Sequence, residues 1–202
     1  DYLYLVENLG NFASYITINI SSPNTEGLRE FHKKENLKEL LSKINIIRDK
    51  SNFKKAFLLK ISPDLNEGNI EEIINLILDY KIDGVILTNT TNGNRNNLLS
   101  NNRDEPGGLS GKPLRDLSTK IIKRFYKDLK NKVPIIGVGG VDSGKTAFEK
   151  ITAGASALQL YTGMVYRGPM IVKKIKKDLI NIINQQGFKK IEEVIGSYAE
   201  KN

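Results

Sequence analysis

The first strand–loop–helix unit of this chain is Tyr15-Ile16-Thr17-Ile18-Asn19-Ile20-Ser21-Ser22-Pro23-Asn24-Thr25-Glu26-Gly27-Leu28-Arg29. It starts with β-rich residues, breaks at Pro23 and Gly27, and leads into a helical segment rich in Lys and Glu. Small polar side chains therefore follow a strand directly, where α/β enzymes place their chemistry. The loop is either a ligand-binding loop, whose amides and hydroxyls suit a flat polar molecule, or an ordinary Ser/Pro/Asn turn.

The same pattern recurs along the chain, because apolar runs of strand length alternate with amphipathic helical segments. We expect strands at Tyr15–Ile20, Ala56–Ile61, Gly84–Thr88, Pro134–Val138 and Ala157–Leu160. We expect helices near residues 36–49, 69–80, 114–130, 143–153, 169–186 and 190–197, with Asn69 and Glu72 capping the second. Repeated β–α units with apolar strands predict a parallel sheet covered by helices.

Every predicted strand ends in polar or glycine residues, so the chemistry is expected at one edge of the sheet. Both a (β/α)8 barrel and an open doubly wound sheet have this property. Five strands are about three too few for a barrel. The chain begins with Asp1 rather than Met, so any missing strands would precede it.

Composition limits the possible functions. The 202 residues are 39% hydrophobic and 27% charged, which fits one globular domain, with no membrane-length apolar run and no signal-peptide pattern. The chain has no cysteine, which excludes disulfides, thiolate zinc sites and a cysteine nucleophile. His32 is its one histidine and lies in a charged segment, so we expect it to be solvated and expect no metal site.

The net charge of +8 is spread over predicted helix faces, for example at Lys173, Lys174, Lys176 and Lys177. No aromatic residues interleave with these lysines as a base-stacking surface would require. We therefore expect no nucleic-acid partner.

Two glycine-rich strand ends suit an anion. The segment from Gly137 to Gly144 follows a strand and opens a helix, and Gln159–Gly163 follows the next strand. Late strand-end loops of this kind hold phosphate in many barrels, although both segments also fit ordinary turns. Lys60 ends an apolar strand and points either into such a site, where it would stabilise negative charge, or into solvent.

Taken in order, the motifs resemble those of the dihydroorotate dehydrogenases, FMN enzymes of pyrimidine synthesis built on a (β/α)8 barrel. The motifs are Asn-x-Ser-Ser-Pro-Asn-Thr-x-Gly-Leu-Arg, Lys-Ile-x-Pro-Asp-Leu, Thr-Asn-Thr-Thr, Gly-Gly-Leu-Ser-Gly-Lys-Pro-Leu, Ile-Gly-Val-Gly-Gly-Val and Gln-Leu-Tyr-Thr. The resemblance extends from about Asn11 to the C-terminus. It implies an α/β fold in which residues 1–202 form the C-terminal portion of one FMN-binding TIM barrel, N-terminally truncated to about five parallel strands.

The resemblance also implies roles for individual residues. Ser22 matches the base that removes a proton from dihydroorotate, and Thr25 matches its proton relay. The positions that match substrate-binding residues are Asn19, Asn24, Asn89 and Thr90. The positions that match FMN-binding residues are Asn19, Lys60, Thr88, Ser110, Gly111, Gly139, Gly140, Tyr161 and Thr162.

Serine rather than cysteine at position 22 is typical of the membrane-associated members that use quinone. The resemblance thus implies oxidation of dihydroorotate to orotate, with quinone as electron acceptor. It implies peripheral attachment to a bacterial or mitochondrial inner membrane through a segment that this sequence lacks. The alternatives are another FMN- or phosphate-binding barrel oxidoreductase, or a non-catalytic fragment. Because about half of the family's site is absent, we expect the isolated chain to be inactive.

Overall fold

Five parallel strands form one sheet in the order β1-β2-β3-β4-β5. The computed structural model describes residues 1–50, 54–93, 95–130 and 132–199. The strands are β1 (Tyr15–Asn19), β2 (Ala56–Ile61), β3 (Gly84–Leu87), β4 (Ile135–Val138) and β5 (Ala157–Gln159). All five predicted strands are confirmed, and β1, β3 and β5 end one residue earlier than expected. Within the described residues the sheet is open, with β1 and β5 at its edges.

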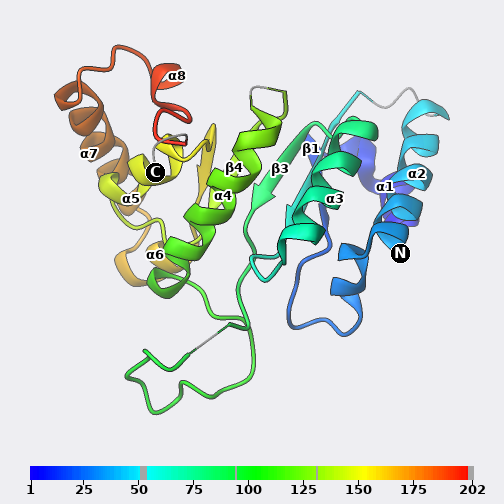
Figure 1. Ribbon diagram of the computed structural model, residues 1–202, viewed down its shortest axis with the longest axis horizontal. Coiled ribbons are helices and arrows are strands. Elements are labelled where there is room, and N and C mark those ends of the chain that lie inside the picture. The colour runs from blue at the N-terminus through cyan, green and yellow to red at the C-terminus, as the bar shows by residue number, and fades with distance from the viewer. Residues whose placement is uncertain (51–53, 94, 131, 200–202) are drawn as a thin grey trace.

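The connections between strands are mainly helical, as the alternating pattern predicts. The helices are α1 (Tyr2–Leu9), α2 (Lys34–Lys50), α3 (Glu67–Asp79), α4 (Arg115–Leu129), α5 (Gly144–Thr152), α6 (Thr162–Arg167), α7 (Ile171–Gln185) and α8 (Ile191–Val194). Short 3-10 turns lie at η1 (Gly10–Phe12), η2 (Leu28–His32) and η3 (Lys112–Leu114). The successive helices α2 to α5 pack against one another along the sheet (Figure 1).

Along strand β2, apolar residues that face the core alternate with residues on the opposite face of the sheet. Phe57, Leu59 and Ile61 are fully buried in the core that the helices cover. Because side chains alternate along a strand, Lys60 lies on the opposite face, the one that turns away from those helices. The strand therefore carries a lysine without placing its charge in the apolar core.

Helix α3 has the expected apolar face, since Ile70, Ile73, Ile74 and Ile77 are buried. The expected cap at Asn69 is wrong. The helix begins at Glu67, and the side chain of Asn66 accepts a hydrogen bond from the Asn69 amide at 2.8 Å. Asn66 has the extended backbone typical of an N-cap.

Helices α1 and α6 were not expected from the pattern. Both are short, and neither has a side-chain cap at its N-terminus. Helix α1 depends on tertiary contacts instead: the Tyr2 hydroxyl donates to the backbone oxygen of Asn19 at 2.6 Å, and its ring packs edge-on against Phe31. Helices of this length are marginal without such packing.

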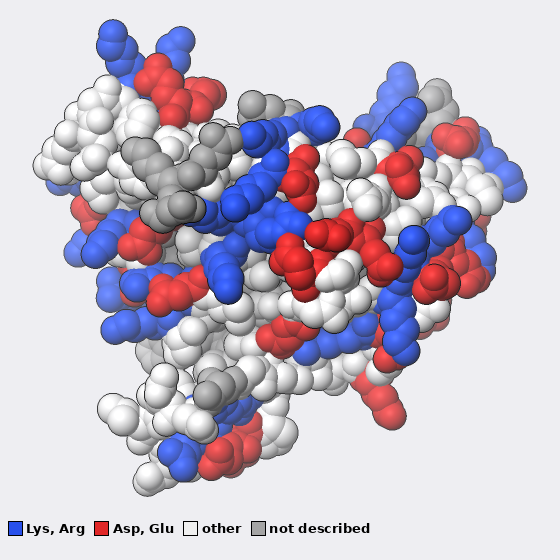
Figure 2. Space-filling model, in the orientation of Figure 1, with Lys and Arg blue, Asp and Glu red and all other residues white. Residues whose placement is uncertain are grey.

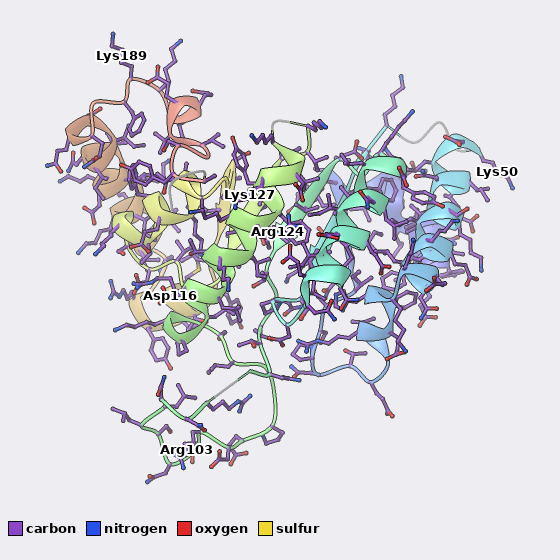
Figure 3. All side chains as sticks on the ribbon, in the orientation of Figure 1. Lys50, Arg103, Asp116, Arg124, Lys127 and Lys189 are labelled. Carbon is purple, nitrogen blue, oxygen red and sulfur yellow. The ribbon has the colours of Figure 1, made fainter. Side chains whose placement is uncertain are left out.

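In Figure 2, a group of Lys and Arg near the centre of the face lies directly beside a group of Asp and Glu. Arg124, labelled in Figure 3, lies on α4 and pairs with Glu67 and Glu71 of α3 and with Asp128 one turn along α4. These pairs join neighbouring helices, although exposed ion pairs contribute little to stability.

Within the described ranges, no helix has the length and apolar character needed to cross a membrane.

His32 corrects an expectation, because it is buried rather than solvated. It lies in η2 and is 7% exposed, and its Nε2 atom has no hydrogen-bond partner among the described residues. Burial and the charge of Arg29 lower the pKa of His32 to about 4, against smaller opposing effects of the Arg29 carbonyl and Asp64. The ring is therefore neutral at pH 7 in the folded chain.

We predict that this buried histidine makes stability fall in mild acid. In the unfolded chain His32 has its ordinary pKa of about 6.5, so between about pH 6.5 and 4 the unfolded state binds the extra proton. Across this window, the free energy of unfolding of the unsubstituted protein should fall by up to about 3 kcal/mol more than that of the H32F variant. Thermal melts of both proteins from pH 8 to 4 measure this difference, and a difference that does not vary with pH would contradict the prediction.

Candidate active site

The carboxyl ends of the strands open onto a cleft of about 1030 Å³, which we call the strand-end cleft. In Figure 1 this edge is at the lower side of the molecule, where the β1–α2 connection, the segment after β3 and α6 all lie. Ten of the predicted site residues line the cleft: Lys60, Thr88, Asn89, Thr90, Ser110, Gly111, Gly139, Gly140, Tyr161 and Thr162. They come from four strand ends and one glycine-rich segment. The fold therefore gathers residues that are up to about a hundred positions apart in the sequence.

One end of the cleft is shaped by close backbone approach. Gly140 has φ +73°, and a Cβ atom there would lie 2.6 Å from the Arg115 Cβ and 3.0 Å from the Gly111 oxygen. Only glycine adopts this backbone without strain. The hydroxyls of Ser110 and Thr162, which line the same cleft, lie 2.9 Å apart. The cleft lining thus combines hydroxyl groups with backbone that carries no side chains.

Helix α5 begins beside this end, but its first turn is occupied by its own cap. The Ser143 side chain accepts from the Thr146 amide, and the Thr146 hydroxyl accepts from the Asp142 and Ser143 amides. The lining of the cleft includes Val141 and Asp142 but no residue of α5. An anion here would therefore be met by the loop and not by the first turn of the helix.

The buried lysine Lys150 supports the glycine loop that follows β4 through contacts with α4. Lys150 of α5 is fully buried and donates to the Ser118 and Thr119 hydroxyls and to the Arg115 carbonyl, at 3.0, 3.1 and 3.3 Å. Ser118 in turn donates to the Val138 carbonyl at 2.6 Å, directly before the two glycines. Burial lowers the pKa of Lys150 to about 8, with the nearby Glu149 opposing that effect.

Lys60 is half-buried and belongs to the cleft lining, so its side chain faces the cleft. Burial lowers the pKa of its ammonium group. No described residue forms an ion pair with it. An ammonium without a counter-ion on a polar cleft wall attracts a group on which negative charge develops.

An amide cluster lies where β1 and β3 end, and its members Asn89 and Thr90 line the cleft. Asn89 donates to the Ser21 hydroxyl at 2.9 Å and to the Asn19 side-chain oxygen at 3.3 Å, and Ser21 donates to the same oxygen at 2.8 Å. The Asn89 side-chain oxygen accepts from the Thr90 amide at 2.7 Å. The amide of Asn89 is thus hydrogen-bonded within the protein on both its nitrogen and its oxygen. No described residue accepts from the Nδ2 group of Asn19, which can therefore donate to a ligand.

Ser22 lies on the loop of residues 20–27, which we call the serine loop and which contains no helix or strand. Its hydroxyl oxygen accepts from the Asn24 amide at 3.2 Å and from the Thr25 hydroxyl at 3.3 Å. The predicted base and its predicted relay are therefore in contact. Two donors aimed at one oxygen stabilise negative charge on it.

Four of the predicted residues do not line the cleft: Asn19, Ser22, Asn24 and Thr25. The serine loop nevertheless packs against the wall of the cleft at Gly108. A Cβ atom at Gly108, on the cleft wall, would lie 1.9 Å from the Thr90 hydroxyl oxygen and 2.8 Å from Pro23 Cγ. Gly108 therefore permits the glycine-rich segment to approach both the serine loop and the end of β3.

The sequence interpretation missed Ser21, Lys150 and the contacts of Arg29 and Asp64. Ser21, Arg29 and Asp64 stand inside the motifs listed above, but spacing along the chain does not show which side chains meet. Lys150 stands on a helix face, where a lysine is normally solvated. No described group of three or more His, Asp or Glu side chains is arranged to hold a metal ion.

Comparisons with known proteins agree with this geometry. The family model described as dihydroorotate dehydrogenase matches residues 1–183. The mitochondrial dihydroorotate dehydrogenase (quinone) of Mus musculus is 46% identical over 97% of this chain and 50% of its own length. The corresponding protein of Arabidopsis thaliana is 44% identical over 98% of this chain and 44% of its own length.

A crystal structure of Eimeria tenella DHODH in complex with ferulenol superposes with a TM-score of 0.95 at 35% identity. The match covers 99% of this chain and 58% of that one. The chain thus spans about half the length of the curated relatives it matches.

Because the matched structures are TIM barrels, the expected fold class is confirmed: five parallel strands that form part of a (β/α)8 barrel. A family match over nearly the whole chain and this structural agreement together place the chain in the dihydroorotate dehydrogenase family.

Proposed function

We propose that this chain carries the proton-abstracting and FMN-phosphate parts of a quinone-dependent dihydroorotate dehydrogenase, and that residues 1–202 belong to a single FMN-binding barrel domain. The observation that carries the proposal is the arrangement along one sheet edge. A serine–threonine hydroxyl pair, an amide cluster, a half-buried lysine and a glycine-lined cradle follow one another there. Family membership supports the same assignment.

The residues present fit FMN. A phosphate needs a backbone that it can approach without meeting side chains, and Gly139 and Gly140 both line the cleft. Ser110 and Thr162 line the same cleft, and the hydroxyl that accepts within their hydrogen bond keeps its own proton for a ligand. Thr88 also belongs to the cleft wall. Lys60 has no described counter-ion, which suits the pyrimidine end of a flavin that gains negative charge. When bound, FMN would accept a hydride from the substrate.

We assign proton abstraction from C5 of dihydroorotate to Ser22. A serine hydroxyl is a weak base at neutral pH, so its oxygen needs help in carrying negative charge and its proton needs a path. The Asn24 amide and the Thr25 hydroxyl both donate to that oxygen, and Thr25 is exposed enough to pass a proton onward. The substrate would lose one proton to this pair and one hydride to the flavin, which yields orotate.

The planar substrate has carbonyl and N–H edges, and amide side chains match both. Asn19 offers a donor, and Asn24, Asn89 and Thr90 surround the same end of the site. Asn89 also fixes the rotamer of Asn19, because it donates to the oxygen of that side chain. We therefore assign Asn89 an orienting role, through which Asn19 presents its donor to the substrate.

Quinone as the electron acceptor follows from the residue type at position 22 and from the names of the relatives. We propose peripheral association with a bacterial or mitochondrial inner membrane on the same grounds.

The full-length protein tests this proposal. We expect it to purify yellow, to release FMN on denaturation, and to be bleached by dihydroorotate without air. A soluble ubiquinone analogue should restore the colour, whereas NAD+ should not. Bleaching by dihydrouracil instead would favour a different dihydropyrimidine oxidoreductase, and a colourless protein without flavin would favour a non-catalytic module.

A further inference from the structure

We propose that Arg29 and Asp64 are positioning residues that hold the serine loop in place for proton abstraction. The inference rests on the proposed function and adds two residues that act through Ser22 and Thr90 without touching substrate. It begins from a half-buried ion pair at the strand-end edge. The Arg29 Nη1 and Asp64 Oδ2 atoms lie 3.1 Å apart, and the two side chains are 27% and 24% exposed.

Arg29 joins the ends of three strands. Besides Asp64, which follows β2, it donates to the Ser21 carbonyl at 3.5 Å and to the Thr90 carbonyl at 3.3 Å. Ser21 precedes the proposed base, and Thr90 follows Asn89 at the end of β3. A guanidinium group can make these contacts together because its donors form a rigid planar fork, which the single ammonium of lysine does not reproduce.

Asp64 completes the link from the other side. Its carboxylate also accepts from the Thr91 hydroxyl, and from the Asn92 amide at 2.9 Å. Thr91 pairs through its backbone with Leu109 at 2.8 and 3.1 Å, so the same carboxylate reaches the glycine-rich segment that lines the cleft. Three kinds of donor on one carboxylate make this pair unlike an isolated surface ion pair.

The serine loop has little structure of its own to hold it. Within residues 20–27 the described hydrogen bonds are the two at the Ser22 oxygen, and two backbone bonds join the end of the loop to η2. The loop is tied to the rest of the site at Ser21, by Asn89 at the hydroxyl and by Arg29 at the carbonyl. Of these two ties, the one through Arg29 also reaches Asp64 after β2. Misplacing a reacting group by about 1 Å can cost about a hundredfold in rate, so loosening this attachment should show in the chemical step.

The chain contains a matched control at the other end of the same strands. Arg48 and Asp83 lie 3.0 Å apart with exposures of 20% and 38%. Arg48 also donates to the Lys81 carbonyl at 3.3 Å, and Asp83 accepts from the Phe57 amide at 2.8 Å. This pair joins α2, the β2 start and the turn before β3, and it lies outside the strand-end cleft. Removing the Arg48–Asp83 pair therefore measures how much the loss of a similar ion pair lowers stability without a change at the cleft.

The experiment compares R29Q, D64N and the double variant with R48Q in the full-length protein. We expect the first three to lower the rate of flavin reduction by dihydroorotate by about tenfold to a hundredfold, with flavin content unchanged. R48Q should match them in melting temperature to within about 4 °C and keep the parent's rate. The double variant should be no slower than the slower single variant, because the two residues act as a unit. R29K should recover only part of the rate.

Amide hydrogen exchange gives a readout that does not depend on the reaction. In R29Q and D64N, peptides covering residues 20–28 and 90–92 should exchange about tenfold faster than in R48Q, without flavin or substrate. Unchanged exchange in those peptides, or equal loss of rate in R29Q and R48Q, would overturn the inference. A parent protein that dihydroorotate does not reduce would instead refute the proposed function, and the exchange comparison would still decide whether the pair orders the loop.

Discussion

Replacing Ser22 by alanine should slow flavin reduction by dihydroorotate by about a hundredfold or more, with FMN still bound. The reason is that the variant removes the oxygen on which Asn24 and Thr25 converge and leaves the glycine-lined end of the cleft intact. Anaerobic stopped-flow absorbance in the full-length protein measures the rate. S22C should retain part of the activity, with a pH profile that rises toward the ordinary thiol pKa of about 8.5.

Ser100 provides the control for this experiment. Its hydroxyl accepts from the Asn102 amide at 3.1 Å, the same two-residue turn contact that Ser22 makes with Asn24 at 3.2 Å. S100A therefore removes a similar turn bond away from the cleft, and its reduction rate should equal that of the parent. If S22A were also reduced at the parent's rate, Ser22 would not be the base.

Replacing Gly140 by alanine should sharply weaken FMN binding. The new Cβ atom would stand 2.6 Å from the Arg115 Cβ and 2.8 Å from its Cα, so the loop must move away from its present position. Because a hydrogen bond to a charged group is worth about 1.5–3 kcal/mol, losing one backbone contact to the phosphate raises the dissociation constant by about tenfold or more. Quenching of flavin fluorescence during titration of the apoprotein measures it.

Gly187 separates this effect from backbone strain. It has φ +80°, close to the +73° of Gly140, and nothing lies within 4 Å of the position a Cβ would take. G187A should therefore bear the same conformational cost of about 1–2 kcal/mol and bind FMN normally. Riboflavin, which lacks the phosphate, should lose much less affinity for G140A than FMN does. Equal losses for both flavins would place the phosphate elsewhere.

The β–α order and the sheet edge at which the polar residues gather can be read from the amino-acid sequence. This is possible because strand and helix periodicities are local, and because parallel strands put all their carboxyl ends on one side. Ten predicted residues accordingly line one cleft. The face of Lys60 was left open by the sequence and follows from the burial of its neighbours on β2 in the structure. The motif order likewise pointed to the family that the whole-chain comparison shows.

Which side chains contact one another becomes visible in the three-dimensional fold and not before. His32 and Lys150 look solvated in the sequence and are buried, because the elements that cover them come from distant parts of the chain. The contacts of Arg29 with Asp64 and Thr90 span 35 and 61 positions, and helix α1 forms against a residue 17 positions away. Local pattern does not encode such pairings, since they depend on how strand ends are brought together by sheet register and by the close approach that Gly108 allows.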